Sequence, residues 1–216
     1  MMIPPNSKLV MIGDSITDCG RQRLIGEAYA DGLGNGYVSL VDALLCSTYP
    51  GHHIRVLNLG IGGNTVLDLE ARWQSDVLDL RPDWLSVMIG INDVWRQFDS
   101  NPAPEQVITR ERYTAVLEKL IGSTRPALKG LVLLTPYYIQ PDRSDPMRAM
   151  MDQYGAVVRQ VALKYNALFV DTQAALDDVM KDIPPLSLAQ DRVHPALAGH
   201  MVLARAFLST IGYEWA

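Results

Sequence analysis

The stretch that decides the fold is Lys8-Leu9-Val10-Met11-Ile12-Gly13-Asp14-Ser15-Ile16-Thr17. It begins as an apolar run of strand length and ends abruptly in Gly13-Asp14-Ser15. A continuous apolar run is typical of a strand that is buried on both faces of a parallel sheet. Ser15 then lies on the turn that leaves the strand, where it either caps the next helix or serves as a nucleophile.

Composition limits the classes of protein that fit. The chain has 216 residues, of which 48% are hydrophobic and 20% charged, and its net charge is −5. This length fits one α/β domain or two small ones. Because the sequence has no internal repeat and no linker, we expect one domain over residues 1–216. The acidic balance gives no reason to expect nucleic acid as a partner. No apolar run approaches the length of a membrane span, and the N-terminus lacks the basic and apolar regions of a secretion signal, so we expect no membrane association and a cytoplasmic location.

The two cysteines, Cys19 and Cys46, fit a reducing compartment, and we expect both to be structural thiols. Among the histidines, His52 and His53 fit a loop, and His200 fits a surface or packing position in the last helix. No spacing of Cys, His and acidic residues is typical of a metal site. The sequence therefore predicts no metal and no cofactor.

Five apolar runs alternate with segments of helical periodicity. The expected strands are residues 8–12, 54–59, 84–89, 130–136 and 167–170, and the expected helices are 37–49, 65–80, one ending near 125, 146–165, 172–181 and 196–211. Loops are expected at 26–36 and around Pro102 and Pro104. This alternation predicts an α/β protein, a three-layer α/β/α sandwich around a five-stranded parallel sheet with right-handed crossovers.

In such sheets, ligands bind at the carboxyl ends of the strands. Ser15, Gly63 and Asn92 each follow a different one of the first three expected strands. Asp191 and His194 lie in a short loop before the last helix, and this loop can return to the same edge. We therefore expect all five residues to converge.

The chemistry of these five residues fits acyl transfer. Asp191 is three residues before His194, so its carboxylate can reach the imidazole Nδ1 and leave Nε2 to face Ser15. The Asn92 amide and the backbone N–H of Gly63 suit a developing oxyanion. The alternatives are a surface turn with a capping Asp, a turn Asn and a turn Gly.

A rival of a different class is a nucleotide- or flavin-binding module. The run Gly60-Ile61-Gly62-Gly63 follows a strand, and a helix N-terminus can bind phosphate. However, residue 65 is Thr where the dinucleotide fingerprint has its third Gly, and no Lys-Ser/Thr pair follows.

Residues around this edge are candidates for contacting a substrate. Four residues that follow strand ends are candidates to line a sugar or acyl pocket: Trp95, Arg96, Tyr137 and Tyr138. For Trp95 and Tyr138, packing in the core is the alternative. Asp14, also a candidate lining residue, and Asp93 flank the reactive residues, where we expect them to provide hydrogen bonds. The loops at the strand ends are polar, which favours a hydroxyl-rich ligand: Asp18, Arg21, Gln22, Arg23, Arg96, Gln97, Asp99, Gln140, Asp142 and Arg143.

Together these motifs resemble the SGNH superfamily, also called GDSL esterases and lipases. The four blocks are Gly13-Asp14-Ser15, Gly63 within residues 58–65, Gly90-Ile91-Asn92-Asp93, and Asp191-Arg192-Val193-His194-Pro195. The resemblance implies a flavodoxin-like strand order 2-1-3-4-5. It implies Ser15, Asp191 and His194 as catalytic triad, and the Ser15 N–H, Gly63 N–H and Asn92 side chain as oxyanion donors.

Within this superfamily the sequence is most similar to xylan acetylesterases. The stretches that carry this similarity are Gly13 to Arg21, Met88 to Gln97, Asp145 to Arg148 and Met151 to Gly155, whereas Gly62 departs from the Ser that often stands in the second block. The similarity implies a serine esterase that removes acetyl groups from acetylated sugars. A short-chain thioesterase or lysophospholipase of the same superfamily is the alternative. Tyr213 and Trp215 near the chain end are expected to dock on the fold or on another subunit, which favours a homo-oligomer.

Overall fold

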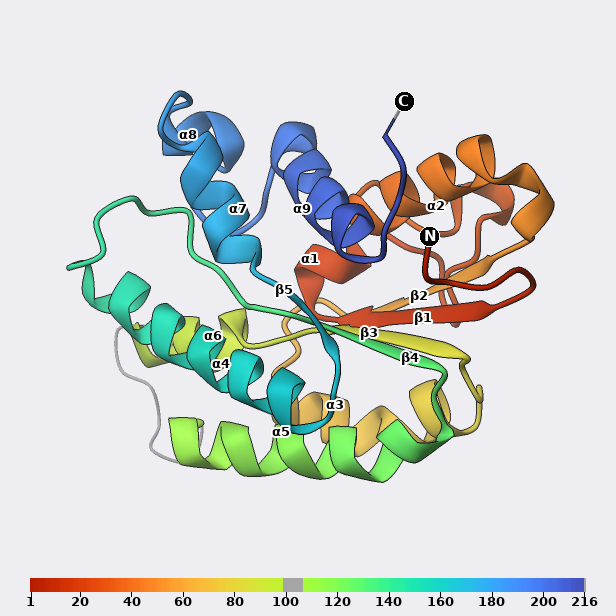
Figure 1. The fold of residues 1–216 in the computed structure, drawn as a ribbon. Coiled ribbons are helices and arrows are strands. Elements are labelled where there is room, and N and C mark those ends of the chain that lie inside the picture. The colour runs from red at the N-terminus through yellow and green to blue at the C-terminus, as the bar shows by residue number, and fades with distance from the viewer. Residues whose placement is uncertain (99–106, 216) are drawn as a thin grey trace.

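The fold is organised around a sheet of five parallel strands in the order β2-β1-β3-β4-β5 (Figure 1). The computed structural model describes residues 1–98 and 107–215. The strands are β1 (Lys8–Gly13), β2 (Arg55–Gly60), β3 (Trp84–Met88), β4 (Gly130–Leu134) and β5 (Leu168–Val170). The α/β class, the parallel sheet and its order are as predicted from the sequence.

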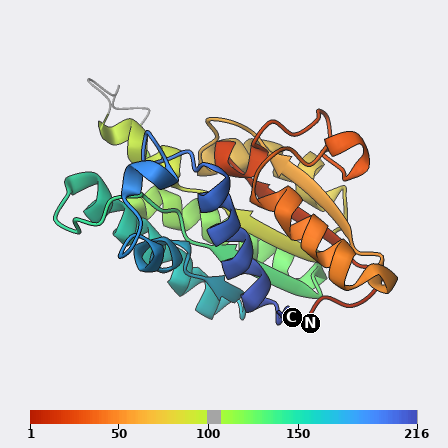
Figure 2. The same ribbon diagram turned by 90° about the horizontal axis from the view of Figure 1, so that it is seen from above.

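Helices cover both faces of the sheet, with α2, α7, α8 and α9 on one side and α3, α4, α5 and α6 on the other (Figures 1 and 2). The α-helices are α1 (Ser15–Asp18), α2 (Tyr37–Thr48), α3 (Val66–Trp73), α4 (Ile91–Trp95), α5 (Arg110–Thr124), α6 (Pro146–Lys164), α7 (Thr172–Val179), α8 (Pro185–Leu188) and α9 (Leu197–Thr210). Short 3-10 turns lie at Tyr29–Asp31, Pro50–His52, Arg96–Phe98 and Arg125–Ala127. The three layers match the predicted sandwich.

The core follows directly from the apolar runs. Leu9, Val10, Met11 and Ile12 of the central strand β1 are each 0% exposed, because helices pack on both faces of the sheet. Burying such side chains contributes about 1.5–3 kcal/mol each. This rigid layer fixes where the first three strands end, and therefore where the loops that follow them begin.

The turn after β1 is tight. Asp14 caps α1 by accepting a hydrogen bond from the Ile16 N–H at 3.0 Å. A Cβ atom at Gly13 would lie 2.3 Å from the Met88 carbonyl oxygen of the neighbouring strand, so only glycine fits there. Ser15 is consequently the first residue of a helix that starts directly at the sheet edge.

The structure departs from the expected elements at a few places. The helix expected over 65–80 is regular only to Trp73 and continues as a π-helical turn, Gln74–Leu78, in which the Asp79 N–H bonds the Gln74 carbonyl at 2.9 Å. Helix α8 was not anticipated, and the loop expected at 26–36 contains one 3-10 turn. Pro102 and Pro104 lie outside the described residues.

The two ends of the described chain lie side by side, since the Met2 N–H bonds the Ile211 carbonyl at 2.7 Å (Figure 2). The C-terminal aromatic residues were expected to dock either on the fold or on another subunit, and in the structure they dock on the fold. The Tyr213 hydroxyl lies 2.5 Å from Thr48 Oγ1, and Trp215 bonds Ser209 at 3.1 Å and packs on Arg205. Trp215 nevertheless remains 43% exposed.

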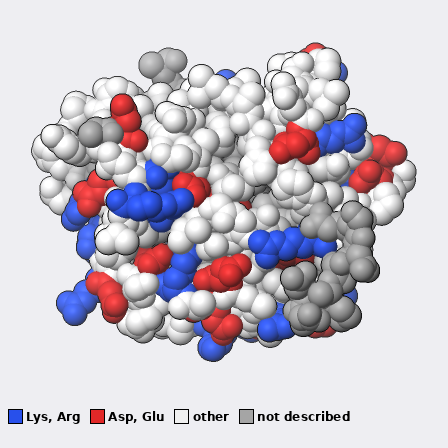
Figure 3. All heavy atoms as spheres, turned by 180° about the vertical axis from the view of Figure 1, so that it is seen from behind, with Lys and Arg blue, Asp and Glu red and all other residues white. Residues whose placement is uncertain are grey.

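Charged side chains of both signs are mixed on the face turned away from the viewer in Figure 1, as Figure 3 shows. On that face the described residues form no continuous basic area of the kind that binds a polyanion. In the described parts of the chain, no helix is both long and apolar enough to cross a membrane.

Candidate active site

Three side chains from opposite ends of the chain form a hydrogen-bonded line at the sheet edge. Ser15 Oγ lies 2.9 Å from His194 Nε2, and His194 Nδ1 lies 2.6 Å from Asp191 Oδ2. Ser15 stands at the start of α1, whereas Asp191 and His194 belong to the loop between α8 and α9. The structure thus brings these three residues together as the sequence predicted.

The tautomer of His194 follows from the state of Asp191. Burial raises the pKa of Asp191, but hydrogen bonds from the His194 side chain and backbone and from the Val193 N–H outweigh it, so the pKa lies below its ordinary value. An ionised carboxylate only accepts hydrogen bonds, so His194 Nδ1 carries the proton that faces it. Neutral His194 therefore presents an unprotonated Nε2 to the Ser15 hydroxyl.

The loop that carries His194 is held by the segment after β4. The Ile139 N–H bonds the Arg192 carbonyl at 2.9 Å, and the Tyr137 hydroxyl bonds the Val193 carbonyl at 3.2 Å. Tyr137 is 0% exposed, so it supports this loop from inside the fold. It does not line a substrate pocket, contrary to the expectation from the sequence.

The second strand ends in a loop with one unoccupied donor. The backbone N–H groups of Ile61, Gly62, Asn64 and Thr65 bond Gly13, Asp18, Ile61 and Asp68, respectively. Within the described residues, no partner is found for the N–H of Gly63, whose φ of +77° suits glycine. This donor is free to serve a ligand next to Ser15.

Asn92 lies at the N-terminus of α4 and contacts the same loop. Its Nδ2 donates one hydrogen to the Asn64 carbonyl at 2.9 Å, which leaves the second amide hydrogen available. The neighbouring Asp93 accepts a hydrogen bond from the Val66 N–H at 3.0 Å. Two of the predicted oxyanion donors, on Gly63 and Asn92, thus belong to segments that are directly bonded to each other.

Two buried carboxyls support these segments. Burial, together with the proximity of Asp93, raises the pKa of Asp14 to about 7, against the lowering effect of the bond from Ile16. Burial likewise raises the pKa of Asp93 to about 7, and its Oδ2 is buried without a partner among the described residues. At 1% exposure Asp14 cannot line a substrate pocket, so only its expected hydrogen-bonding role fits.

Some supporting residues were not predicted as such. Asp18 and Arg21, expected on a polar rim, are 7% and 5% exposed. Asp18 Oδ2 accepts from the Gly62 N–H at 2.9 Å, and Arg21 Nε donates to the Gly60 carbonyl at 2.6 Å. Arg72 of α3 braces the ends of β1 and β2 through the Gly13 and Leu59 carbonyls. No sequence pattern distinguishes these residues from solvated ones, since only the fold brings backbone carbonyls within reach.

The remaining candidates lie near the site in different ways. The Trp95 ring stands edge-on to His194, with centroids 5.9 Å apart, so it borders the reactive groups. Arg96 is exposed, and its Nη2 donates to the Gly63 carbonyl. Tyr138 is half-buried, and its backbone bonds the Gln173 side chain at 2.8 and 3.1 Å. Asp99, also expected on the polar rim, lies outside the described residues.

A second histidine lies beneath the site without joining it. Burial lowers the pKa of His200 to about 4, so it stays neutral. Its Nδ1 accepts from the Tyr37 N–H at 3.2 Å, so its Nε2 carries the proton and points at Cys19 Sγ, 3.4 Å away. Cys19 is therefore a packing thiol, as expected, whereas Cys46 is exposed on α2.

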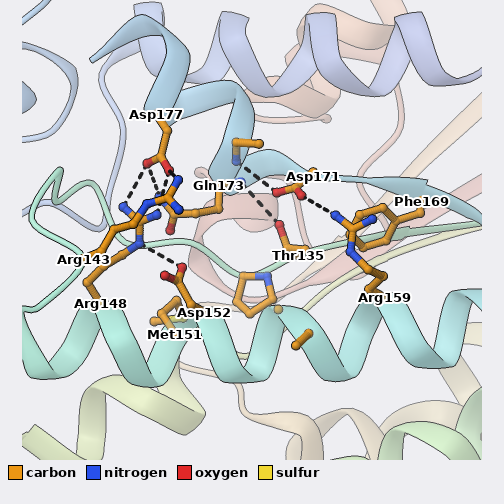
Figure 4. A pocket seen from close by; sticks show the side chains of 14 residues that line it. Thr135, Arg143, Arg148, Met151, Asp152, Arg159, Phe169, Asp171, Gln173 and Asp177 are labelled. Atoms are coloured by element: carbon orange, nitrogen blue, oxygen red, sulfur yellow. Dashed lines mark hydrogen bonds and ion pairs between the residues drawn. The ribbon is translucent and has the colours of Figure 1, made fainter. Parts of the chain in front are cut away.

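A cavity of about 230 Å³ lies away from the triad, between α6 and α7 (Figure 4). Its charged side chains are paired: Arg148 with Asp152 and Asp177, and Arg159 with Asp171. None of Ser15, Asp191 or His194 lines it. In this cavity and in the rest of the described chain, no group of three or more His, Cys, Asp or Glu residues could hold a metal ion.

Comparisons with known proteins agree with this geometry. Residues 11–202 match the GDSL-like Lipase/Acylhydrolase family. An acetylxylan esterase of Geobacillus stearothermophilus is 55% identical over 215 residues, which cover 100% of this chain and 98% of that protein. The crystal structure of Axe2, an acetylxylan esterase from that organism, matches with a TM-score of 0.98 at 55% identity, covering 100% of this chain and 99% of the other. A structure of Axe2 described as its catalytic mutant S15A matches equally well, with the same TM-score, identity and coverage.

Proposed function

Because the chain belongs to the GDSL-like lipase/acylhydrolase family, we propose that it is a serine esterase that removes acetyl groups from acetylated xylan or xylo-oligosaccharides. The observation that carries this proposal is the line from Ser15 through His194 to Asp191, next to free donors on Gly63 and Asn92. In this role Ser15 is the nucleophile, His194 the general acid and base, and Asp191 the residue that orients it.

Acylation follows from the positions of the protons. Ser15 Oγ attacks the acetyl carbonyl carbon while its proton passes to His194 Nε2, 2.9 Å away. The carbonyl oxygen becomes an oxyanion that accepts hydrogen bonds from the Ser15 N–H, the Gly63 N–H and Asn92 Nδ2. The tetrahedral intermediate collapses, and the departing sugar oxygen takes the proton from His194, which leaves an acetyl ester on Ser15.

Deacylation repeats these steps with water. His194 Nε2 takes a proton from a water molecule, whose oxygen attacks the acetyl-enzyme carbonyl. The same three donors stabilise the second oxyanion. When this intermediate collapses, acetate leaves and His194 returns its proton to Ser15 Oγ. Asp191 stabilises the imidazolium in both halves of the cycle without taking up a proton.

The acetylated saccharide is supported by the relatives and by the polar surroundings of the site. A relative that is 55% identical over the full chain is an acetylxylan esterase. Arg23 is half-exposed and Arg96 exposed beside the Gly60–Gly63 loop, which suits a hydroxyl-rich ligand better than a long acyl chain. The competing assignment is a short-chain thioesterase or lysophospholipase of the same family.

The proposal extends to the setting of the enzyme. We propose that residues 1–216 act as one domain, that the protein works in the cytoplasm on small acetylated saccharides, and that it forms a homo-oligomer. The exposed part of Trp215, held in place by Arg205 and Ser209, supports self-association because a rigid aromatic surface costs little to bury. Sedimentation at micromolar concentration tests it, and a monomeric mass would contradict it.

The experiment that tests the function is a substrate panel. We expect kcat/KM to fall steeply from acetyl to butyryl to octanoyl 4-nitrophenyl esters, and acetate to be released from acetylated xylo-oligosaccharides. Matched acetyl and butyryl thioesters separate a thioesterase from an oxygen esterase. Preference for the octanoyl ester, or no acetate from any acetylated sugar, would contradict the proposed substrate.

A further inference from the structure

We infer that Arg96 is a positioning residue that holds the Gly63 donor in register with Asn92, so that α4 sets both oxyanion donors at once. This inference rests on the proposed function, because it assigns a role within the acyl-transfer site. Sequence position alone placed Arg96 among residues that contact substrate. The contacts of its guanidinium point to a different role.

The first step is that α4 and the turn after it contact the loop after β2 and the start of α3 at three points. From α4 and the turn that follows it, Asn92 Nδ2 donates to the Asn64 carbonyl, Asp93 accepts from the Val66 N–H, and Arg96 donates to the Gly63 carbonyl. Because α4 also carries the Asn92 amide, these bonds tie the loop to the helix that supplies the other donor. Of the three, only the bond from Arg96 reaches Gly63 itself.

The second step is that Gly63 needs such a tether. It is a glycine at φ +77°, with no side chain to restrict its backbone, and its N–H has no partner within the described chain. Its neighbours are fixed, Gly62 by Asp18 and Asn64 by Ile61. The Gly63 carbonyl shares a peptide plane with the Asn64 N–H, which bonds Ile61. Arg96 is the side chain that holds this plane from its carbonyl side.

The third step is the expected size of the effect. Losing an oxyanion donor outright costs about 10²–10³-fold in kcat. A donor that is present but loosely held should lower kcat by less than a missing donor does. We therefore expect kcat to fall about tenfold when Arg96 is replaced. An oxyanion forms in acylation and again in deacylation, so both steps slow together and KM stays nearly unchanged.

The test uses Arg96→Met and Arg96→Lys, with Arg159→Met as the control. Arg159 is half-exposed and bonds Asp171 far from the triad, so this control removes an arginine with a comparable contact. With 4-nitrophenyl acetate, which carries no sugar, Arg96→Met should lower kcat about tenfold and leave KM and the melting temperature unchanged. Inhibition by methylboronic acid, whose tetrahedral adduct on Ser15 requires the same donors, should weaken by a similar factor.

Arg96→Lys keeps a donor at this position and should recover most of the lost kcat. If Arg96→Met keeps the wild-type kcat, or raises only the KM for acetylated xylo-oligosaccharides, Arg96 is a substrate contact or a bystander and the inference is overturned. A lysine variant no better than the methionine variant would likewise exclude the hydrogen bond as the cause. Failure of the proposed function is distinct, since the wild-type protein itself would then release no 4-nitrophenol.

Discussion

Two polar regions of the molecule differ in how their groups are paired. In the cavity between α6 and α7, the buried Arg148 bonds Asp152, Asp177 and the Gln140 carbonyl, so the charges compensate one another (Figure 4). At the Ser15 edge, the Gly63 N–H and Asp93 Oδ2 have no partner within the described chain, and Asp14 and Asp93 have raised pKa values. Compensated groups hold a fold together, whereas unpaired donors and shifted carboxyls are typical of a reaction site.

The largest expected effect removes the nucleophile. Ser15→Ala should lower kcat for acetyl ester hydrolysis by about 10⁵–10⁶-fold, because covalent catalysis is lost. Ser15 is only half-buried, so the melting temperature should stay close to that of the wild type. Steady-state kinetics and thermal unfolding of the same preparation test this expectation. A variant that keeps most of its turnover would remove Ser15 from the mechanism.

The next effect should appear in stability and not in turnover. Arg148→Met leaves Asp152 and Asp177 without their buried cation, which we expect to cost about 3–5 kcal/mol in the free energy of unfolding. Urea denaturation measures this loss, and kcat of the folded fraction should change little. The surface variant Lys181→Met, which breaks an exposed pair with Asp178, is the control and should leave the free energy of unfolding nearly unchanged.

Asn92→Ala, at the Ser15 edge, should instead lower turnover and leave stability nearly unchanged. Loss of the amide donor should lower kcat by about 10²–10³-fold, which corresponds to about 2.7–4 kcal/mol of transition-state stabilisation, with KM little changed. Steady-state kinetics with 4-nitrophenyl acetate provide both constants. If stability falls while kcat of the folded protein is retained, Asn92 is a turn residue and the contrast between the two regions fails.

A smaller effect concerns the pH dependence of stability. The pKa of Asp93 is raised from 3.8 to about 7, so the folded protein binds this proton more tightly than the unfolded chain does. This tighter proton binding contributes fully to the free energy of unfolding below about pH 4. The contribution declines as the pH rises towards 7 and is lost above that value. Between pH 5 and 8 the loss amounts to about 2–3 kcal/mol.

Asp93→Asn replaces the carboxyl by a neutral group of the same shape, so the fall in stability between pH 5 and pH 8 should shrink relative to the wild type. Urea denaturation at the two pH values measures it. The exposed Asp182→Asn is the matched control and should leave the fall unchanged. An Asp93→Asn variant with the same pH dependence as the wild type would show that this carboxyl does not stay protonated in the fold.

The sequence predicted the sheet well, because its strands are short apolar runs that are followed within two residues by Gly, Pro or Asp or end in Gly. The strand order came from the resemblance to the SGNH superfamily. The triad was also indicated by local spacing, because Asp191 lies three residues before His194. What escaped prediction depends on long-range contacts: Arg72, Asp18 and Tyr137 reach backbone groups of distant segments. Their side chains are polar or amphipathic, and nothing in their neighbours along the chain tells whether a carbonyl or solvent faces them.

Mass spectrometry of acid-quenched enzyme shows whether Ser15 forms the acetyl-enzyme. After milliseconds of reaction with 4-nitrophenyl acetate, we expect a burst of about one 4-nitrophenol per active site and one acetyl group on the peptide that contains Ser15. The Ser15→Ala protein should show neither. An acetyl group on Cys19 or on another residue, or a wild-type protein that turns over without acetylation of Ser15, would exclude Ser15 as the nucleophile.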